Sequence, residues 1–228
     1  MQIEILPTAD AAAARAAVVI ANIVRNAVTE RGRCSFAVSG GRTPWQMLRE
    51  LASESLPWDK VHLFQTDERV APQGDADRNL THIAESLLTR IALPAANMHA
   101  MPVEVPDLDA AGAAYAGEIA SVAGTPATFD LIHLGLGPDG HTASLVPGDP
   151  VLDVTRANVA ITHPYHGHCR MTLTFPVLDN ARRLLWIVTG AEKVEMLKRL
   201  QASDRSIPAG RVRPDQALII ADAAAAGG

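Results

Sequence analysis

The chain has 228 residues, of which 48% are hydrophobic and 20% charged, a composition typical of a globular protein with a sizeable core. A net charge of −5 argues against nucleic acid or an anionic membrane as the main partner. The two cysteines, Cys34 and Cys169, form no C-x-x-C pair, so they indicate neither a disulfide framework nor a zinc ribbon. Their use agrees with a reducing cytoplasm, where we expect the protein to be located.

The N-terminal region predicts a strand over residues 2–6 and then a helix that Thr8 or Asp10 caps and Gly32 ends. Arg15 and other polar residues interrupt its alanine-rich run, so we expect neither a signal peptide nor a membrane span. We expect one α/β domain over residues 1–228, with a frayed tail over 221–228.

Strands and helical stretches alternate along the rest of the chain. Further strands are predicted over residues 34–38, 61–65, 129–134, 171–175, 184–188 and 218–220, with residues 98–105 ambiguous. Further helices are predicted from 44 to about 51, around 80–88, over 110–122 and over 191–200. This alternation is typical of a doubly wound, mainly parallel α/β sheet with helices on both faces. The polar loops 39–43, 67–69, 135–141 and 189–193 each follow a strand, so we expect them to meet at one sheet edge.

The loop after strand 129–134 carries the densest chemistry in the chain. Three glycines there allow a tight turn, and the turn also holds Asp139 and His141. A free imidazole has a pKa near 6.5, so a histidine at neutral pH is able to accept a proton. We interpret His141 as a general base and Asp139 as the group that orients its tautomer or a water, against the alternative of a purely structural turn.

The same loop contains Gly135-x-Gly137-x-x-Gly140, which matches the dinucleotide-binding fingerprint. That fingerprint must open a full helix whose N-terminus holds the pyrophosphate. Pro138 lies inside the glycine triplet, and residues 147–150, Pro-Gly-Asp-Pro, stop any helix after about two turns. The context therefore disfavours a nicotinamide dinucleotide.

The segment 39–44, Ser-Gly-Gly-Arg-Thr-Pro, indicates an anion site ahead of a helix, with Thr43 as the N-cap and Pro44 as the first helical residue. A tight turn with a capping threonine is the alternative. The spacing of a nucleoside triphosphate loop is missing. Lys193, just inside a later helix, is placed to reach the same anion, although a lone lysine is more often solvated.

Three arginines, Arg42, Arg69 and Arg170, are further candidates for binding phosphate or hydroxyl groups. The run Asp67-Glu68-Arg69 either positions a sugar or forms a local ion pair. Both alternatives remain open from the residues alone.

A histidine-rich segment, residues 163–169, matches no zinc spacing, and Pro164 and Gly167 favour a solvated loop. Trp45 and Trp186 are expected to pack in the core. No metal site is expected here.

Taken together, these loops resemble the 6-phosphogluconolactonase family, within the superfamily of glucosamine-6-phosphate isomerases and deaminases. The resemblance rests on five segments in the family's order: Ser-Gly-Gly-Arg-Thr-Pro (39–44), Thr-Asp-Glu-Arg (66–69), Gly-Leu-Gly-Pro-Asp-Gly-His-Thr-Ala-Ser-Leu (135–145), Arg-Met-Thr-Leu-Thr-Phe-Pro-Val-Leu (170–178) and Val-Thr-Gly-Ala-Glu-Lys (188–193).

The resemblance implies hydrolysis of 6-phosphoglucono-1,5-lactone to 6-phosphogluconate in the oxidative pentose phosphate pathway, without a metal or other cofactor. It implies that His141 is the base, with Asp139 as its partner. It implies a substrate site made of Ser39, Gly40, Gly41, Arg42, Thr43, Asp67, Arg69, Gly137, Arg170 and Lys193. Within that set, Gly40, Gly41, Thr43 and Lys193 hold the phosphate, Arg170 assists them, and Asp67 and Arg69 line the sugar site. We expect a monomer or homodimer with a small phosphosugar lactone as its partner.

Two departures from related patterns bear on this interpretation. The deaminase branch has a glutamate that assists ring opening, whereas this chain has Val146 at that place, which favours the lactonase. Arg42 replaces the more usual serine or threonine after the two glycines.

The alternatives to a lactonase are an aldose or amino-sugar phosphate isomerase or deaminase and a non-catalytic sugar-phosphate sensor. The sensor is disfavoured by the lack of an attached DNA-binding segment or a basic patch.

Overall fold

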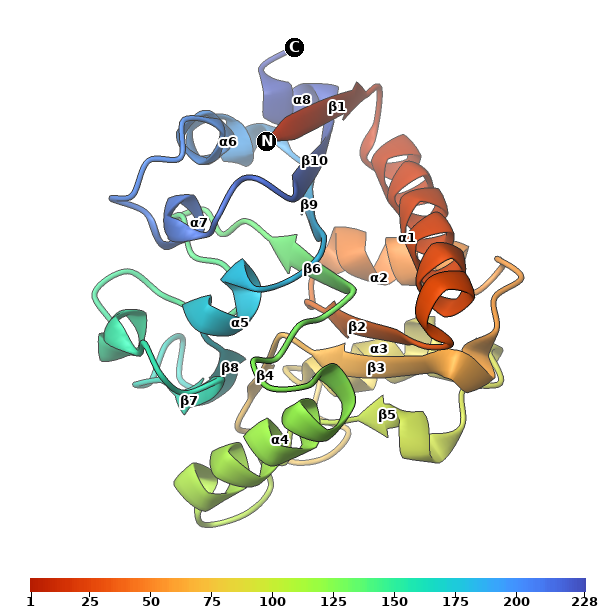
Figure 1. Ribbon diagram of the computed structural model, residues 1–228. Coiled ribbons are helices and arrows are strands. Elements are labelled where there is room, and N and C mark those ends of the chain that lie inside the picture. The colour runs from red at the N-terminus through yellow and green to blue at the C-terminus, as the bar shows by residue number, and fades with distance from the viewer.

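A seven-stranded parallel sheet forms the centre of the computed structural model, which describes residues 1–228 (Figure 1). Its strand order is β1-β10-β9-β6-β2-β3-β5. The strands are β1 (Gln2–Leu6), β2 (Cys34–Val38), β3 (Val61–Gln65), β5 (Met98–His99), β6 (Leu131–Gly135), β9 (Leu184–Val188) and β10 (Ala217–Asp222). All six pairings are parallel, so the predicted doubly wound sheet is confirmed.

The order of the strands reverses at the middle of the sheet. From β2 the chain adds β3 and β5 on one side, and from β6 it adds β9 and β10 on the other. Strands β2 and β6 pair directly, with Phe36 opposite Leu131. The loops that leave these two strands diverge to opposite sides and leave a crevice at their carboxyl ends, where α/β proteins bind ligands.

A second, three-stranded antiparallel sheet contains β4 (Asp67–Arg69), β8 (Arg170–Leu173) and β7 (Val159–Ile161), in that order. Residues 67–69 were predicted as a polar loop, and that prediction was wrong, because they form β4. The strand predicted over 171–175 is confirmed as β8, and it lies in this second sheet. Thr66 connects the two sheets, because its N–H donates to the Val38 carbonyl of β2 and its own carbonyl accepts from the Leu173 N–H of β8. A three-residue strand is too short for its alternation to be recognised in a sequence.

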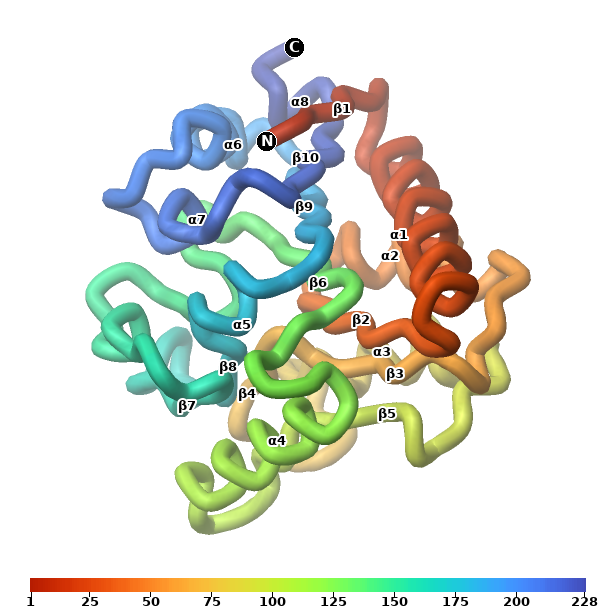
Figure 2. Tube along the Cα trace, viewed as in Figure 1, coloured from red at the N-terminus to blue at the C-terminus, as the bar shows by residue number.

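Helices cover both faces of the main sheet, as Figures 1 and 2 show. A cluster of 23 buried residues lies on the face with α1 (Ala9–Arg31), α2 (Arg42–Leu51) and α3 (Asn79–Ser86). A cluster of 33 lies on the other face with α4 (Leu108–Ala123), α5 (Phe175–Asp179), α6 (Val194–Gln201), α7 (Pro208–Arg211) and α8 (Ala223–Ala226). Trp186 is fully buried in the second cluster, as predicted. Short 3₁₀ turns lie at Trp58–Lys60, Leu88–Arg90, Ala95–Asn97, Pro150–Asp153 and Ala191–Lys193.

Helix α1 begins and ends as its sequence predicts. The Thr8 hydroxyl accepts from Ala11 N at 3.1 Å, and Gly32 ends the helix at φ 74°. By length and composition alone α1 passes as a membrane span, but the buried face of the helix packs on the sheet. Its buried side chains are Ala12, Ala13, Ala16, Ala17, Ile20, Ala21, Val24 and Ala27.

Two other helix predictions need correction. Helix α2 begins at Arg42, with Gly41 at φ 128° as its N-cap, so Thr43 is inside the helix and caps nothing. The predicted frayed tail over 221–228 is also wrong, because β10 continues to Asp222 and α8 follows it. The Asp222 carboxylate caps α8 by accepting from Ala225 N at 2.8 Å, which stabilises a run of alanines with high helix propensity.

A buried carboxylate attaches α3 to the second sheet. Glu68 is fully buried and accepts from the N–H groups of Asn79 and Leu80, at 2.8 and 2.9 Å, at the start of α3. Arg78, which is 2% exposed, lies 3.1 Å from the Glu68 carboxylate and 2.6 Å from that of the exposed Glu104. The pair therefore holds the first turn of α3 against β4.

Replacing Glu68 with glutamine leaves Arg78 buried without its enclosed counter-charge, and we expect a loss of about 3–5 kcal/mol in the free energy of unfolding. Glu104→Gln removes the other, exposed carboxylate of the same arginine and is expected to cost less than about 1 kcal/mol. Urea denaturation of both variants measures the difference. Equal costs would contradict the assignment of Glu68 as the structural partner.

Candidate active site

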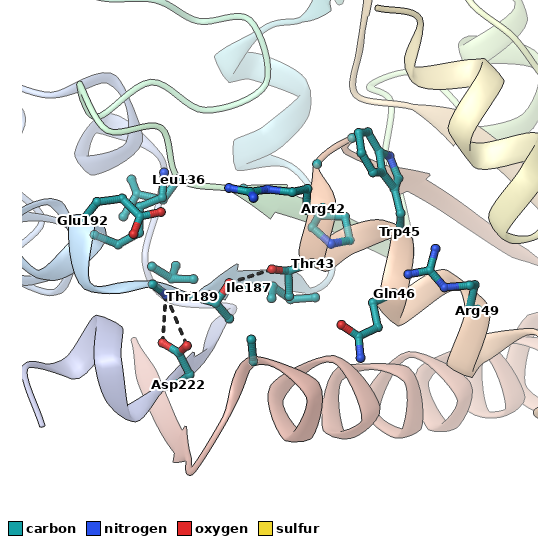
Figure 3. A pocket seen from close by; sticks show the side chains of 18 residues that line it. Arg42, Thr43, Trp45, Gln46, Arg49, Leu136, Ile187, Thr189, Glu192 and Asp222 are labelled. Atoms are coloured by element: carbon teal, nitrogen blue, oxygen red, sulfur yellow. Dashed lines mark hydrogen bonds between the residues drawn. The ribbon is translucent and has the colours of Figure 1, made fainter. Parts of the chain in front are cut away.

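A cavity of about 250 Å³ lies at the carboxyl edge of the main sheet, beside the β2–β6 pair. It brings together most of the predicted residues: Ser39, Gly40, Gly41, Asp67, Arg69, Gly137, His141, Arg170 and Lys193. A second cavity of about 720 Å³ adjoins it, shares Gly40, Gly41 and Lys193 with it, and adds Arg42 and Thr43 (Figure 3). The predicted convergence of loops from β2, β3, β6 and β9 is therefore what the structure shows.

His141 and Asp139 form a hydrogen-bonded pair on the loop after β6. The Asp139 Oδ1 atom lies 2.5 Å from His141 Nδ1 and also accepts from the His141 backbone N–H at 3.2 Å. Burial opposes the charge of Asp139, but its contacts with His141 and Tyr165 hold the pKa of this carboxyl well below its ordinary value. Because a carboxylate only accepts, Nδ1 donates in this hydrogen bond, so in the neutral ring Nε2 is the nitrogen with the free lone pair. A side chain that is 21% exposed and lines the cavity is thus prepared to accept a proton there.

Gly137 is needed because the imidazole packs directly against it. A Cβ atom at residue 137 would collide with the His141 ring, and the backbone here is closed by Gly137 N–H donating to the His141 carbonyl at 2.8 Å. Gly140, at φ 84°, completes the turn in the left-handed region. The glycine density read in the sequence therefore brings the histidine ring close to the backbone of its own loop.

Two arginines face each other across the second sheet. Arg69 of β4 and Arg170 of β8 are direct antiparallel partners, and the Nε atom of each is buried without a hydrogen-bond partner. Burial, together with the charge of Arg69, lowers the pKa of Arg170 from its ordinary value. Two adjacent guanidinium groups that line a cavity are suited to an anionic or strongly polarised oxygen ligand.

Asp67 is 5% exposed and is held by neighbours that the sequence analysis missed. The Ser144 hydroxyl donates to its carboxylate at 2.7 Å, and the Asn79 amide donates to its carbonyl at 2.9 Å. The Asn79 amide also lies so close to Gly40 that a side chain at residue 40 would collide with it. Ser144 lies inside the glycine-rich motif, but Asn79 starts a separate helix and no local pattern connects it to the site.

The second cavity carries positive charge at the starts of two helices. Burial lowers the pKa of the Lys193 ammonium, and Arg42 adds to the effect while Glu192 and Asp139 oppose it. The Thr43 and Thr189 hydroxyls are 2.6 Å apart and join the start of α2 to the loop after β9. In Figure 3 the Arg42 side chain extends over the cavity towards Leu136. This end of the site is suited to a phosphate group.

The position predicted for Trp45 was wrong. Its side chain is half-buried, lines both cavities and stacks on His82 with ring centroids 4.0 Å apart. The first turns of α2 start at the carboxyl edge of the sheet, so a residue there faces the site before the helix reaches the core.

The histidine-rich segment forms the end of a hairpin between β7 and β8. There His168 contacts the Val70 carbonyl at 3.2 Å and the Asp77 carboxylate at 3.1 Å. No group of three His, Cys, Asp or Glu side chains in residues 1–228 has an arrangement that could hold a metal ion. Tyr165, also on this hairpin, reaches the Asp139 carboxylate and was not recognised in the sequence.

One edge of this doubly wound sheet carries a Gly-Gly turn, a Gly-x-Gly-x-Asp-Gly-His loop and a lysine late in the chain. This arrangement defines a class of sugar-phosphate enzymes, and the similarity of the chain to a known family agrees with that class. Residues 7–221 match the model of the family "Glucosamine-6-phosphate isomerases/6-phosphogluconolactonase", so the chain belongs to this family. Its relatives within this family include 6-phosphogluconolactonases.

The 6-phosphogluconolactonase of Synechocystis sp. is 35% identical over 225 residues, covering 96% of this chain and 93% of the relative. That of Mycobacterium tuberculosis is 37% identical over 204 residues, covering 85% and 83%. The crystal structure of the Thermotoga maritima 6-phosphogluconolactonase superposes with a TM-score of 0.87 at 29% identity, covering 97% of this chain and 98% of that one. A monomeric glucosamine-6-phosphate deaminase has a TM-score of 0.86 at 17% identity, which shows only the shared fold.

A fully buried histidine behind the site makes the protein sensitive to acid. His133 of β6 accepts from Ser39 N–H at 3.3 Å through Nδ1, its Nε2 has no partner, and burial lowers its pKa to about 3. In the unfolded chain a histidine binds its proton near pH 6.5, so acid favours unfolding between these two values.

We expect His133 to contribute a slope of about 1.4 kcal/mol of unfolding free energy per pH unit between pH 6 and pH 4, with stability falling as the pH falls. The variant His133→Gln should lack this contribution, whereas His163→Gln, at an exposed position, should keep it. Urea denaturation across this pH range measures the slopes. The same slope in wild type and His133→Gln would contradict the assignment.

Proposed function

We propose that the protein is a 6-phosphogluconolactonase that hydrolyses 6-phospho-D-glucono-1,5-lactone to 6-phospho-D-gluconate in the oxidative pentose phosphate pathway. The observation that carries the proposal is the Asp139–His141 pair in a cavity lined by arginines and Lys193, where the neutral imidazole has Nε2 available to accept a proton. The relatives that are 35% and 37% identical are 6-phosphogluconolactonases, which supports the choice within the family.

His141 acts as the general base in this mechanism. Its Nε2 takes a proton from water while the water oxygen attacks C1 of the lactone, and negative charge develops on the carbonyl oxygen. Cleavage of the bond between C1 and the ring oxygen opens the lactone, and the leaving oxygen takes the proton back from the imidazolium. Asp139 accepts the hydrogen bond from His141 Nδ1–H throughout the reaction and stabilises the positively charged ring.

The arginine pair is suited to the developing charge. Arg69 and Arg170 line the same cavity as His141, so the guanidinium group of one of them is able to donate to the carbonyl oxygen as it becomes anionic. Asp67, held by Ser144, has a second role as acceptor for a sugar hydroxyl. Ser39 and Gly137 complete the walls of this part of the site.

The phosphate occupies the end of the site at the N-terminus of α2. Gly40, Gly41 and Thr43 contribute backbone and hydroxyl donors, and Lys193 and Arg42 contribute charge. A valine at residue 146, buried beside the catalytic loop, has no proton to exchange, which disfavours the ring-opening chemistry of a deaminase.

For the compartment we propose the cytoplasm, since both cysteines are free and Cys34 is buried in β2. The human relative named "GDH/6PGL endoplasmic bifunctional protein" is 33% identical over 205 residues, which cover 26% of its length. We propose a monomer or homodimer as the working form.

His141→Ala should lower kcat by about 10²- to 10⁴-fold, because the base is removed while the cavity remains. The measurement is a coupled assay in which glucose-6-phosphate dehydrogenase makes the lactone and 6-phosphogluconate dehydrogenase reports its hydrolysis. The lactone also opens spontaneously, so the rate above that background counts. Near-wild-type turnover by the variant would remove His141 from the role of base, and no acceleration by folded wild type would overturn the proposed function.

Lys193→Ala should raise KM by roughly 10- to 100-fold and change kcat less, because a charged contact to phosphate is lost from both ground and transition states. Lys198→Ala, in the exposed part of the next helix, is the matched control and should leave KM unchanged. Both constants come from the same coupled assay. An unchanged KM in Lys193→Ala would exclude its contact with phosphate.

A further inference from the structure

Tyr165 lies on a tight hairpin that brings its side chain to the catalytic loop. Its N–H donates to the His168 carbonyl at 2.9 Å, and the His168 N–H donates back at 3.3 Å. The two residues between them, His166 and Gly167, have φ values of 50° and 86°. Two successive positive φ values characterise a two-residue hairpin turn, whose backbone geometry is well defined. The backbone at Tyr165 is therefore held in place although it lies in a loop.

The Tyr165 hydroxyl donates to the Asp139 carboxylate at 3.0 Å. It uses Oδ2, whereas the His141 imidazole is bound to Oδ1 of the same carboxylate. The structure gives Asp139 no other donors than this hydroxyl and the backbone and ring N–H groups of His141. The three side chains thus form a chain of hydrogen bonds, from Tyr165 through Asp139 to His141.

Two further contacts fix the tyrosine ring. It meets the His141 ring edge to face, with centroids 5.6 Å apart and an interplanar angle of 71°. The Arg170 guanidinium lies 5.0 Å from the ring centroid and donates to the Tyr165 carbonyl at 3.4 Å. Burial and the neighbouring Asp139 raise the pKa of Tyr165, so its hydroxyl stays protonated and donates over the working pH range.

We infer that Tyr165 is a positioning residue, which acts through Asp139 to set the orientation and the proton affinity of the His141 imidazole. This inference rests on the proposed role of His141 as base. A donor on Oδ2 draws negative charge away from the oxygen that faces His141, so the carboxylate stabilises the imidazolium less. Tyr165 therefore keeps His141 neutral, and able to accept a proton, to lower pH than the Asp139 pair alone would.

Other charged groups surround the same pair and enter the electrostatics of His141. Lys193 acts on Asp139 from the turn after β9, and Arg69, Asp67 and Arg170 line the cavity from the second sheet. The His166 ring meets the Tyr165 ring edge to face, with centroids 4.2 Å apart. None of them donates a hydrogen bond to Asp139. Removing only the Tyr165 hydroxyl therefore tests the hydrogen-bonded chain from Tyr165 through Asp139 to His141.

Tyr165→Phe removes the hydroxyl and keeps the ring contacts. We expect the acid limb of the kcat/KM profile, and the midpoint of the His141 titration followed by NMR, to move up by roughly 0.5 to 1 pH unit. At high pH, kcat should stay within about tenfold of wild type, because Asp139 still binds Nδ1. The signal of His141 is assigned from the spectrum of His141→Gln, in which it is missing.

The matched control is Tyr115→Phe, which removes the hydroxyl of the only other tyrosine. That hydroxyl donates to the His99 carbonyl at 3.0 Å, away from the cavity, so the variant should leave the His141 titration unchanged. In an Asp139→Asn background Tyr165→Phe should add no further shift, because the group that transmits its effect is gone. The same shift in that background would show that Tyr165 does not act through Asp139.

The two proposals fail in different ways. If wild type does not hydrolyse the lactone, the proposed function is wrong, and the NMR titration still decides whether Tyr165 acts on His141. If wild type is active and His141→Ala is not, but Tyr165→Phe has wild-type titration and pH profile, only the inference about Tyr165 is overturned. A shift to lower pH would overturn it as well, since the sign would be opposite to that of a lost donor.

Discussion

The parallel pairing of β2 with β6 determines where everything else in this protein lies. Parallel strands end at a common edge, and the two strands at the switch point lead their loops away in opposite directions. The Gly-Gly turn and the Asp139–His141 loop are those two loops. The other residues that line the cavity come from the loops after β3 and β9, the next strands outward, which reach the same edge of the sheet.

Hydrogen bonds from hydroxyl groups connect these loops to one another at the edge of the sheet. Thr43 contacts Thr189, Ser39 contacts Thr66, and Ser144 donates to Asp67, each pair joining segments that follow different strands. Such contacts fix the charged and basic side chains before substrate arrives, which lowers the cost of ordering them during the reaction. The buried Glu68–Arg78 pair has the same effect on Asn79 through the start of α3.

The sequence predicted the central sheet and most of the site, because buried strands, glycine turns and the family's motifs are local patterns. Nine of the predicted site residues line one cavity, and Arg42 and Thr43 line its neighbour. Prediction from the sequence failed where a residue's position depends on contact with a segment that is distant in the chain. The strand character of 67–69 depends on pairing with 170–172, and Asn79 and Tyr165 reach the site through a capped helix and a two-residue turn. Trp45 was misplaced because an aromatic residue on an amphipathic helix indicates a core unless the helix is known to start at the site.

Strand β10 connects the edge of the sheet to the turn before Lys193, at the proposed phosphate end of the site. It pairs with β1 and β9, and at its end both Asp222 carboxylate oxygens accept from the Gly190 N–H, at 3.0 and 3.2 Å, three residues before Lys193. During synthesis β1 therefore has to remain unpaired until β10 has been made. Until then the Gly190 turn lacks its acceptor, so a chain still attached to the ribosome at this point has an incomplete site. Folding during synthesis can form the first helices of this protein, but the Gly190 turn, at the proposed phosphate end of the site, is completed only with the final strand.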